Sequence, residues 1–508
     1  MGSTLQQAVL EGLSVKNGND VALECDGRKV TFEECDAITN CIASVLNNNG
    51  LHAGKTIALR MKRSERMFLA IYAIMKTGAA VLPIPASMPK KRVEEIYTQT
   101  DVDFTMTDEE YERLIAEVRD EKVSSLEDIP RATEEDLALI LFTSGSTGKP
   151  KGVVHTQKSA LGVMNRFPYD VCEVGVECDS FRTVIARTNI NFVSAYIFEV
   201  LQPILFGNKL VVLTDDEQNS VIDIAKIIKN HEKCFIFLTP SQIDSFLSDE
   251  SFCSAFRSLG AILLGGERTS SEVLEHVLEK ASAQTKLLSG YGSTECGLIA
   301  CGDFRDGKGG QLKLLPKTKA IFVDSDKRVQ GSSNQGELCL SSKSVFACYT
   351  NCDAHKIANE GESYFCTGDI GYINSDGALI LKGRADRMVK VHGMRVELTD
   401  IESNICKFDD IRECAVVINK TDADTEVLSA FYVTKDGVEV DEKQLRCFLK
   451  DWLPVNLIPV GLTQLETLPK NENGKRDYKK LESMPYVQDD FEQELSDSIN
   501  SEIGRAHV

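Results

Sequence analysis

The sequence contains little tryptophan or histidine and no long apolar run. Among its 508 residues there are one Trp and seven His. No stretch approaches the ~20 consecutive apolar residues that a membrane-spanning helix needs, so we expect no membrane partner. The amino-terminal stretch "MGSTLQQAVLEGL" is polar and amphipathic without an apolar centre. We therefore expect no signal peptide and a soluble, cytoplasmic protein.

Basic residues are fewer than acidic residues. The chain carries 57 Lys and Arg against 77 Asp and Glu, which gives a formal net charge of -20 at pH 7. A protein with this balance cannot neutralise a phosphate backbone, which argues against a general nucleic-acid binder. Small anionic ligands are compatible with it, because local dipoles and single lysines bind them.

Cysteine is abundant, but the spacing that marks a metal or redox motif is absent. The 16 cysteines extend from Cys25 to Cys447, and no pair has the C-x-x-C spacing. The histidines form no cluster of ligands along the sequence either. Since disulfide frameworks belong mainly to small secreted domains, we expect buried, reduced thiols rather than metal-binding or redox sites.

The length and the residue pattern predict an α/β protein of more than one domain. A chain of 508 residues is too long for a single core. Residues 65–84 read as a buried helix that stops at Gly78, followed by a short apolar strand, and residues 233–247 and 259–281 repeat a strand–loop–helix order. This alternation predicts helices layered on largely parallel sheets, in which ligands gather at the carboxyl ends of strands.

From Gly377 onward the pattern changes to short alternating strands, a charged kink and a helix that begins near Leu398. We therefore expect a large N-terminal domain over residues 1–385 and a small C-terminal α+β domain over residues 386–484. The tail, residues 485–508, is acidic and helical in pattern and belongs to neither domain.

An apolar strand-like run ends in a loop, residues 143–152, that consists almost entirely of hydroxyl residues, glycines and lysines. Glycines bring backbone N–H groups close to an anion, and hydroxyls and lysines add donors and charge, so the loop predicts a phosphate site. It is not a nucleotide-binding P-loop, because Thr143 stands at the first glycine and Pro150 follows Lys149 in place of Ser or Thr. For the loop alone, an ordinary solvent-exposed connection is the alternative.

Three further stretches accompany this loop in a fixed order. The four read "FTSGSTGKPKG" at residues 142–152, "YGSTE" at 291–295, "YFCTGDIGYINSDGALILKGRAD" at 364–386 and "NENGK" at 471–475. From Val30 to Leu481 the chain resembles the adenylate-forming superfamily, and it looks closest to the adenylation domains of nonribosomal peptide synthetases. Four ordered matches make the resemblance specific, whereas one glycine-rich loop would be weak.

The resemblance implies a fold and a reaction. The fold would be a large domain of layered, mostly parallel sheets with a small, mobile C-terminal α+β domain. The reaction joins a small carboxylic acid to ATP, releases pyrophosphate and leaves an acyl-adenylate, whose acyl group then passes to a thiol. ATP and Mg²⁺ would be the cofactors. Such an enzyme must hold two anions together and stabilise the charge on the phosphoryl group.

The catalytic roles of the family transfer to three residues. Lys475 would reach the substrate carboxylate and the phosphate oxygens, Thr294 would place its hydroxyl on the α-phosphate, and Glu295 would bind the magnesium ion. Asp386 matches the hinge about which the small domain would rotate between the half-reactions. The strand and loop around Gly393 would line the path of the thiol.

The resemblance assigns a larger set of residues to the nucleotide. Tyr291 would lie against adenine, Asp369 would accept from the ribose hydroxyls, and Arg384 would lie near ribose and phosphate. A turn residue is the plain alternative for Asp369. The full set is Thr143, Ser144, Gly145, Ser146, Thr147, Gly148, Lys151, Gly265, Gly266, Glu267, Tyr291, Gly292, Ser293, Asp369 and Arg384.

The segment that would bind the acid, residues 186–210, departs from the family pattern. Adenylation domains for α-amino acids carry an aspartate that pairs with the substrate ammonium, and here Ser194 or Val193 occupies that position, depending on the alignment. A desolvated ammonium without a carboxylate partner is costly. We therefore expect an apolar or aryl acid that lacks an α-amino group. An α-amino acid whose ammonium binds elsewhere is the alternative.

The other positions that transfer to the substrate pocket are mostly apolar, and the small ones would leave room for a flat or bulky group. Asn191 would suit an aryl acid if the alignment shifts. The pocket set is Asn191, Val193, Ser194, Ala195, Phe198, Phe237, Leu263, Gly265, Gly290 and Leu298.

The acceptor thiol is left open between two classes. Residues 485–508 look like the start of the first helix of a carrier domain, but the chain contains no "GGxS" attachment serine. We expect transfer to the phosphopantetheine thiol of a separate or downstream carrier protein, with free coenzyme A as the alternative. A luciferase-like oxidation would share every motif. The non-enzymatic alternative is an adenylation fold that only binds nucleotide. The presence of all four family residues argues against it, because a domain without catalysis need not retain them: Glu295, Asp369, Arg384 and Lys475.

Overall fold

The structure is a computed structural model of the chain. It describes residues 3–14, 18–120, 128–143, 150–164, 167, 181–267, 269, 271–306, 310–351, 353–384, 388–391, 394–420, 426–435, 438–470 and 476–485. The chain divides into two compact units. The first comprises Met1–Ala86, Asp101–Leu141 and Gly152–Asp386, and the second comprises Ser87–Thr100, Phe142–Lys151 and Arg387–Val508.

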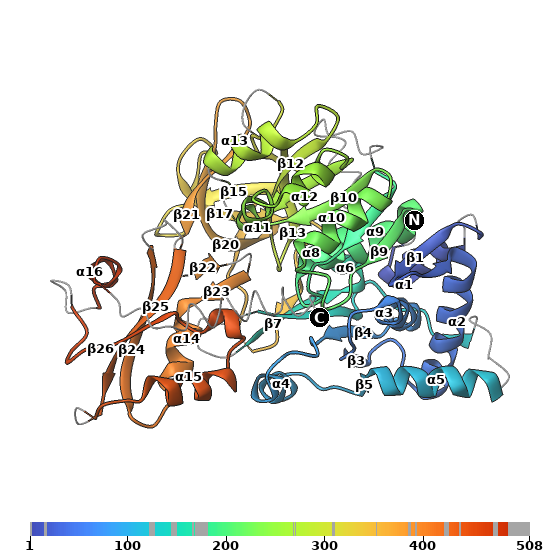
Figure 1. The fold of residues 1–508 in the computed structure, drawn as a ribbon, viewed down its shortest axis with the longest axis horizontal. Coiled ribbons are helices and arrows are strands. Elements are labelled where there is room, and N and C mark those ends of the chain that lie inside the picture. Colours follow the sequence, from blue (N-terminus) through green and yellow to red (C-terminus); the bar gives the residue numbers. More distant parts are fainter. Residues whose placement is uncertain are drawn as a thin grey trace. The chain divides into compact units, whose positions relative to one another are not determined.

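The largest sheet of the first unit has nine strands (Figure 1). Their order is β14 (Lys313–Leu314), β13 (Gly297–Asp303), β12 (Lys286–Ser293), β11 (Ala261–Gly265), β10 (Cys234–Leu238), β8 (Thr183–Ala186), β9 (Lys209–Val212), β1 (Val21–Cys25) and β2 (Arg28–Thr31). Neighbours from β12 to β1 in that order are parallel. The alternation of strands and helices predicted this parallel interior, but not the antiparallel strands β2, β13 and β14 toward its two edges.

Both faces of the nine-stranded sheet are covered. Successive side chains along its strands point to opposite faces and belong to two different apolar clusters. Val184 and Phe235 belong to one cluster, whereas the next residues along the strands, Ile185 and Ile236, belong to the other. Four helices bury the face that carries Ile185 (Figure 1). They are α10 (Val221–Asn230), α11 (Pro240–Phe246), α12 (Glu250–Phe256) and α13 (Ser271–Lys280).

The other face belongs to the main apolar cluster, which also takes residues from a second, six-stranded sheet. The order of that sheet is β18 (Cys348–Tyr349), β7 (Lys151–Thr156), β6 (Leu137–Thr143), β4 (Ala80–Pro83), β3 (Thr56–Leu59) and β5 (Phe104–Met106). Helical elements contribute the rest of the cluster. They are α1 (Leu5–Ser14), α2 (Phe32–Asn48), α3 (Glu65–Thr77), α5 (Asp108–Asp120), α6 (Gln157–Met164), α8 (Val193–Ala195), the π-helical turn η2 (Tyr196–Val200) and α9 (Leu201–Phe206).

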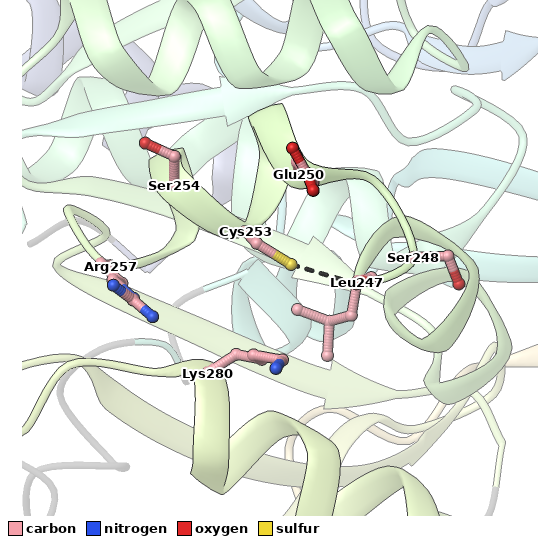
Figure 2. Close-up of a pocket in the computed structure, with 7 residues that line it drawn as sticks. All are labelled: Leu247, Ser248, Glu250, Cys253, Ser254, Arg257 and Lys280. Carbon is pink, nitrogen blue, oxygen red and sulfur yellow. Dashed lines mark hydrogen bonds between the residues drawn. The ribbon is translucent and has the colours of Figure 1, made fainter.

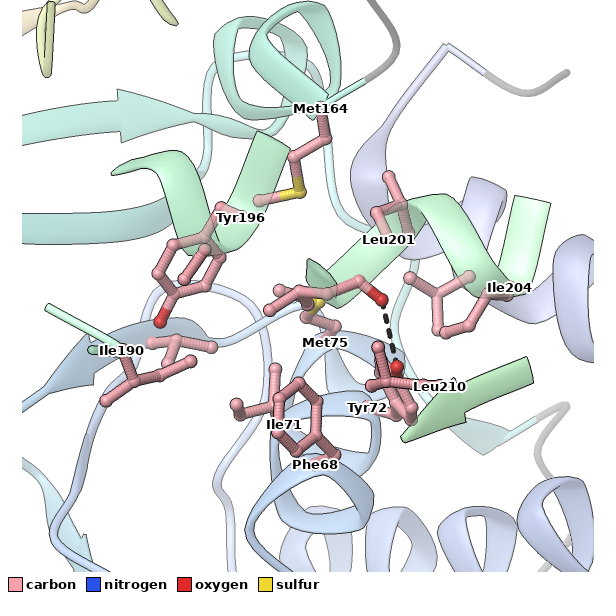
Figure 3. Close-up of a cluster of buried hydrophobic side chains, with 14 of the residues drawn as sticks. Phe68, Ile71, Tyr72, Met75, Met164, Ile190, Tyr196, Leu201, Ile204 and Leu210 are labelled. Carbon is pink, nitrogen blue, oxygen red and sulfur yellow. Dashed lines mark hydrogen bonds between the residues drawn. The ribbon is translucent and has the colours of Figure 1, made fainter. Parts of the chain in front are cut away.

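Helix α3 shows how the local sequence determines an element of this layer. Ser64 caps its start by accepting from the Met67 N–H, and Gly78, at φ 81°, ends it in the left-handed region. Almost every α3 side chain is buried, as expected for a helix that is apolar all round. In Figure 3 its side chains point toward η2 and α9, and the Tyr72 hydroxyl donates to the Val200 carbonyl at 2.9 Å. Helix, glycine stop and strand are confirmed here.

A third sheet of the first unit is antiparallel throughout and holds the longest strand, β20. Its order is β16 (Val329–Gln330), β15 (Lys319–Val323), β17 (Gly336–Ser341), β20 (Glu362–Ile373) and β19 (Lys356–Asn359), with β21 (Leu379–Arg384) also paired to β20. The cysteine expectation is wrong in this sheet, because Cys339 on β17 and Cys366 on β20 form a disulfide. They are 27 residues apart, so no spacing motif marks them.

The second unit contains the hairpin β22 (Met388–Val391) and β23 (Met394–Glu397) and a three-stranded sheet, and α14 begins at Leu398 as expected. Figure 1 shows α14 and α15 on one face of the three-stranded sheet and α16 on the other, which agrees with the two apolar clusters of this unit. The remaining elements are α4 (Lys90–Tyr97), α14 (Leu398–Ile405), β24 (Ile411–Lys420), β25 (Glu426–Thr434), α15 (Glu442–Lys450), the 3-10 turn η3 (Val455–Leu457), β26 (Gly461–Gln464) and α16 (Tyr478–Glu482).

Residues of helix α4 form ion pairs with residues of the second unit that lie 308 and 312 positions further along the chain. The Arg92 guanidinium lies 3.0 Å from the Asp400 carboxylate, and the Lys407 ammonium lies 3.0 Å from Glu95. Among the helices that the structure describes, none combines the length and apolarity needed to traverse a lipid bilayer.

Candidate active site

The "YGSTE" stretch forms the end of the β12–β13 hairpin. Gly292 pairs with Leu298 and Ser293 pairs with Gly297. A Cβ on Gly292 would lie 2.4 Å from the Gly297 carbonyl oxygen, so this crossing requires glycine. Tyr291, Gly292 and Ser293 lie within β12, and a strand rather than a helix follows.

Three polar side chains from different strands meet at Asp369 on β20. Arg384 lies opposite Asp369 on β21, and its guanidinium donates to Asp369 Oδ1 at 2.9 Å. The Tyr291 hydroxyl donates to Asp369 Oδ2. Each carboxylate oxygen has a second lone pair, so Asp369 keeps acceptor capacity for a ligand hydroxyl. Burial, with Asp369 adding to it, raises the pKa of Tyr291 well above its ordinary value, so the phenol remains a donor.

Glu295 is a fully buried carboxylate at the tip of the same hairpin. Its Oε1 accepts from the Tyr349 hydroxyl at 2.8 Å, and its carbonyl accepts from the Phe346 N–H at 2.8 Å. Two residues earlier on the same hairpin, the Ser293 hydroxyl is buried and has no hydrogen-bond partner within the described part of the chain. A carboxylate and a hydroxyl are oxygen ligands of the kind that Mg²⁺ takes together with phosphate oxygens. The residues present therefore fit that ion.

The sequence did not indicate His155, which supports the tip of the hairpin. Its Nε2 lies 2.9 Å from the Thr294 carbonyl and its Nδ1 lies 3.3 Å from the Ser159 hydroxyl. Since a carbonyl only accepts, Nε2 carries the proton and Nδ1 accepts from Ser159. Burial lowers the pKa of His155 from 6.5 to about 4, which keeps the ring neutral. A single histidine in the buried strand "KGVVHT" was the available signal.

The stretch Gly265, Gly266 and Glu267 follows β11 as expected. Gly266 has a φ of 85°, and a Cβ on Gly265 would lie 3.0 Å from the Gly290 carbonyl oxygen. The Glu267 carboxylate accepts from the Ser241 N–H and hydroxyl, both at 3.1 Å. Glu267 thus anchors the start of α11, and Gly266 adopts a backbone conformation that favours glycine.

The proposed phosphate loop is described only at its ends, which belong to the second unit. The Thr143 hydroxyl donates to the Lys151 carbonyl at 3.4 Å, which joins the end of β6 to the start of β7. The residues predicted for phosphate, catalysis and the hinge that lie outside the described residues are Ser144, Gly145, Ser146, Thr147, Gly148, Lys475 and Asp386.

The structure brings several residues of the predicted substrate pocket together beside β11 and β12. The rings of Phe198 and Phe237 stack with centroids 5.0 Å apart. A Cβ on Gly290 would lie 2.8 Å from a Leu263 methyl group and 3.2 Å from a Leu298 methyl group. The two leucines therefore occupy the space that the sequence left for a bulky group at Gly290.

The predicted pocket residues on the preceding segment differ in burial. Ala195 is fully buried, whereas Val193 and Ser194 are partly exposed at the start of α8. The Asn191 Oδ1 atom is buried and has no hydrogen-bond partner among the residues that the structure describes. An acceptor of this kind suits a ligand that brings a donor to it.

Glu199 is the only acidic residue of the segment 186–210, and its carboxylate is held by three hydrogen bonds. Its Oε1 accepts from the backbone N–H groups of Arg187 and Thr188 at 3.2 and 2.9 Å, and its Oε2 lies 3.3 Å from the Arg63 guanidinium. The Arg63 and Glu199 side chains are 4% and 1% exposed. Burial raises the pKa of Glu199, and Arg63 opposes that shift. This carboxylate holds the segment in place, and at 1% exposed it is buried away from a ligand ammonium.

A surface cavity of about 390 Å³ lies elsewhere in the first unit, along α12 and the end of α13 (Figure 2). Its lining is mostly polar and exposed, and the Cys253 thiol donates to the Leu247 carbonyl at 3.0 Å. None of the residues predicted for nucleotide or substrate lines it. The cavity is therefore separate from the candidate site.

Two family matches cover most of the chain, and Asp369 and Arg384 lie between the two matched ranges. The AMP-binding enzyme family matches residues 11–350, and the AMP-binding enzyme C-terminal domain matches residues 400–475. The chain belongs to the AMP-binding enzyme family. It is an adenylate-forming ligase, close to the adenylation domains of nonribosomal peptide synthetases, as the sequence motifs predicted. The large parallel-rich domain and the small C-terminal domain are likewise confirmed.

Individual relatives and solved structures are also similar to this chain, at sequence identities of 28% and below. Tyrocidine synthase 2 from Brevibacillus parabrevis is 28% identical over 504 residues, which cover 94% of this chain and 13% of the relative. NpsA-ThdA from Klebsiella oxytoca, an artificially fused adenylation–PCP di-domain NRPS, matches with a TM-score of 0.78 at 20% identity and covers 91% of this chain and 93% of its own. o-Succinylbenzoate CoA synthetase (MenE) from Bacillus subtilis matches with a TM-score of 0.78 at 22% identity, covering 95% and 99%. The chain thus spans a small part of the length of the curated relative.

Proposed function

We propose that this AMP-binding enzyme activates a small carboxylic acid with ATP, releases pyrophosphate, and passes the acyl group from the adenylate to the phosphopantetheine thiol of a carrier protein. The observation that carries the proposal is the meeting of Tyr291, Asp369 and Arg384, which come from three strands and form one polar group in the first unit. A carboxylate beside a guanidinium and a phenol provides acceptors for ribose and positive charge for phosphate.

Each remaining residue has a proposed role in the same reaction. Glu295 would hold Mg²⁺, which supplies positive charge to the phosphate oxygens. Thr294 would donate to the α-phosphate, and His155 keeps the backbone of Thr294 in position. Lys475 would act as a movable cation at the substrate carboxylate, and the loop from Ser144 to Gly148 would hold the β- and γ-phosphates with Lys151.

The proposed substrate is an apolar or aryl acid without an α-amino group. The support is Glu199: it is the only carboxylate in residues 186–210, and two backbone N–H groups and a guanidinium already engage it. An ammonium at Ser194 or Val193 would find no counter-charge within that segment. The stacked rings of Phe198 and Phe237 offer an apolar wall instead. An α-amino acid remains the second candidate, because the buried Asn191 oxygen would accept from an ammonium.

The acceptor is proposed from the relatives. NpsA-ThdA is an adenylation domain fused to a PCP domain, which favours a carrier protein. o-Succinylbenzoate CoA synthetase is named for coenzyme A, so free coenzyme A is the alternative acceptor.

Carboxylate-dependent ATP–pyrophosphate exchange tests the proposal. Each α-amino acid is paired with its des-amino acid, and benzoic-type and short fatty acids complete the panel. We expect exchange only with acids that lack the amino group. Exchange with an amino acid at equal or higher efficiency would overturn the substrate assignment but leave adenylation intact. Absence of exchange across the panel would overturn the activity itself.

Two variants sharpen this experiment. Lys475→Ala should lose most exchange while ATP binding persists, and equal turnover by this variant would exclude the catalytic role of Lys475. Ser194→Asp adds the missing carboxylate, so we expect it to gain exchange with an amino acid, whereas Val193→Asp should gain it only if the other alignment holds. Incubation of the loaded enzyme with a pantetheinylated carrier or with coenzyme A then identifies the acceptor.

A further inference from the structure

Side chains with nitrogen, sulfur and oxygen ligand atoms gather on the third sheet, outside the candidate active site. Cys339 on β17 lies directly opposite Cys366 on β20, and the Cys366 N–H donates to the carbonyl of His355, which precedes β19, at 2.9 Å. The carboxylate of Glu337, the imidazole of His355 and the sulfur of Cys366 each place a ligand atom within 4.8 Å of the others, and the sulfur of Cys339 is bonded to that of Cys366. Two paired strands and the residue that precedes a third strand therefore bring their side chains to one place.

Strand register explains why these residues share a face. Residues directly opposite each other on paired strands point to the same side of the sheet, and so do residues two apart along one strand. Leu338 and Phe365, the neighbours of the two cysteines, belong to the apolar cluster on the opposite face. The cysteines lie in a separate small cluster. The ligand face is thus distinct from the face that builds the core.

We propose that the reduced form of this cluster binds Zn²⁺ through Cys339, Cys366, His355 and Glu337. Two sulfurs, one nitrogen and one oxygen form a tetrahedral ligand set for zinc. Thiolate ligands favour zinc over magnesium or calcium, which prefer oxygen. His355 is exposed, so its ring can rotate to shorten the ligand distances.

The cysteines form a disulfide in this structure, so zinc binding requires a reductant. A cellular dithiol supplies two electrons and two protons, which break the sulfur–sulfur bond and leave two thiols, while the dithiol becomes a disulfide. Zn²⁺ then replaces the two thiol protons, and the ligated sulfurs are thiolates. The cluster therefore has two closed states, one covalent and one metal-bound, which exclude each other.

Glu337 is already held in a place that attracts a cation. Its carboxylate accepts from the Gly368 N–H at 3.1 Å and pairs with the Lys327 ammonium. The Lys327 side chain is 41% exposed, whereas that of Glu337 is 12% exposed. Zn²⁺ would take the place of the lysine charge at the carboxylate, and the lysine would return to solvent at little cost.

Metal binding by the full chain tests the proposal. The protein is reduced with a phosphine under argon and freed of reductant. It is titrated with Co²⁺, whose bonds to thiolates absorb in the near ultraviolet. A second titration uses Zn²⁺ in competition with a chromophoric chelator. We expect about one equivalent of metal in a tetrahedral thiolate site. Cys366→Ser should abolish the cobalt–thiolate band. His355→Ala should weaken binding at least ~10-fold, since losing a ligand costs no less than losing an outer partner.

Matched variants exclude the other cysteines. Cys348→Ser, an exposed cysteine of the same region, should bind as the wild type does. If circular dichroism shows that Cys366→Ser does not fold, the reduced wild-type protein tests the proposal by alkylation with and without Zn²⁺. Zn²⁺ should protect Cys339 and Cys366 from alkylation, located by peptide mass spectrometry. A reduced wild type that binds no metal, or metal binding that leaves Cys339 and Cys366 unprotected, would overturn the proposal.

Discussion

Acid should destabilise the first unit through His155, and replacement of this residue should remove that effect. The ring is fully buried, and its pKa falls from 6.5 in the unfolded chain to about 4 in the folded one. Between these values the unfolded state binds more protons than the folded state, so stability rises with pH. The contribution is complete above pH 6.5 and is lost as the pH falls toward the folded value.

The magnitude follows from the same two values. The interval from 6.5 to about 4 corresponds to ~3 kcal/mol at ~1.4 kcal/mol for each pH unit. By pH 5 about 2 kcal/mol of it is already lost. The physical cause is the burial of the ring, which penalises its charged form, and the bond to the Thr294 carbonyl and the nearby Glu295 carboxylate only partly oppose the shift.

Urea unfolding followed by far-ultraviolet circular dichroism, at pH 7.5 and pH 5, measures the effect. His155→Gln has no titrating group, so its loss of stability on acidification should be smaller than that of the wild type by about 2 kcal/mol. His276→Gln, at a side chain that is 59% exposed, serves as the matched control and should follow the wild type. Equal losses in wild type and His155→Gln would refute the reasoning.

Three further substitutions test the site and its supports. Glu199→Gln leaves a buried guanidinium without its counter-charge and should lower the free energy of unfolding by ~3 kcal/mol, measured in urea, whereas exposed Glu250→Gln should not. Asp369→Asn weakens two hydrogen bonds and removes the charge that faces Arg384, so the KM for ATP in the exchange assay should rise at least ~10-fold without loss of fold. Gly292→Ala meets a carbonyl oxygen at 2.4 Å and should reduce exchange at least ~10-fold, whereas Gly331→Ala has its nearest neighbour at 3.8 Å and should be silent. Normal exchange by Gly292→Ala would mean that the hairpin tolerates displacement.

The fold was predictable wherever local chemistry determines an element. Ser64 and Gly78 bound α3 because a hydroxyl cap and a left-handed residue act within one turn of the helix. The parallel strands followed from alternating apolar runs and helices. The antiparallel strands β13 and β14 did not follow, and the pairing of β13 with β12 includes a turn at Gly297, which has a φ of 66°. A strand pair of this kind is chosen by tertiary contact rather than by composition.

The candidate site was predictable as a set of residues but not as a geometry. The motifs named Tyr291, Asp369 and Arg384, because the resemblance assigns them roles. The bond from the Tyr291 hydroxyl to Asp369 joins strands of two different sheets, and nothing in the spacing of 78 residues announces it. The same holds for His155, whose partner Thr294 is 139 residues away. From the sequence alone, a buried histidine is interpreted as a packing residue of the core, because its hydrogen-bond acceptor is not known.

The cysteines show most clearly where the spacing of residues along the chain misleads. A metal motif is recognised when its ligands lie on one turn, so that a fixed number of residues separates them. Glu337, Cys339, His355 and Cys366 have no such spacing, because an antiparallel sheet sets their separations by the lengths of two connections and by strand register. Changes in connection length would alter the spacing and leave the cluster intact. Ligand sets across strands must therefore be sought by register, and here register joins two strands whose cysteines the sequence had assigned to separate, reduced thiols.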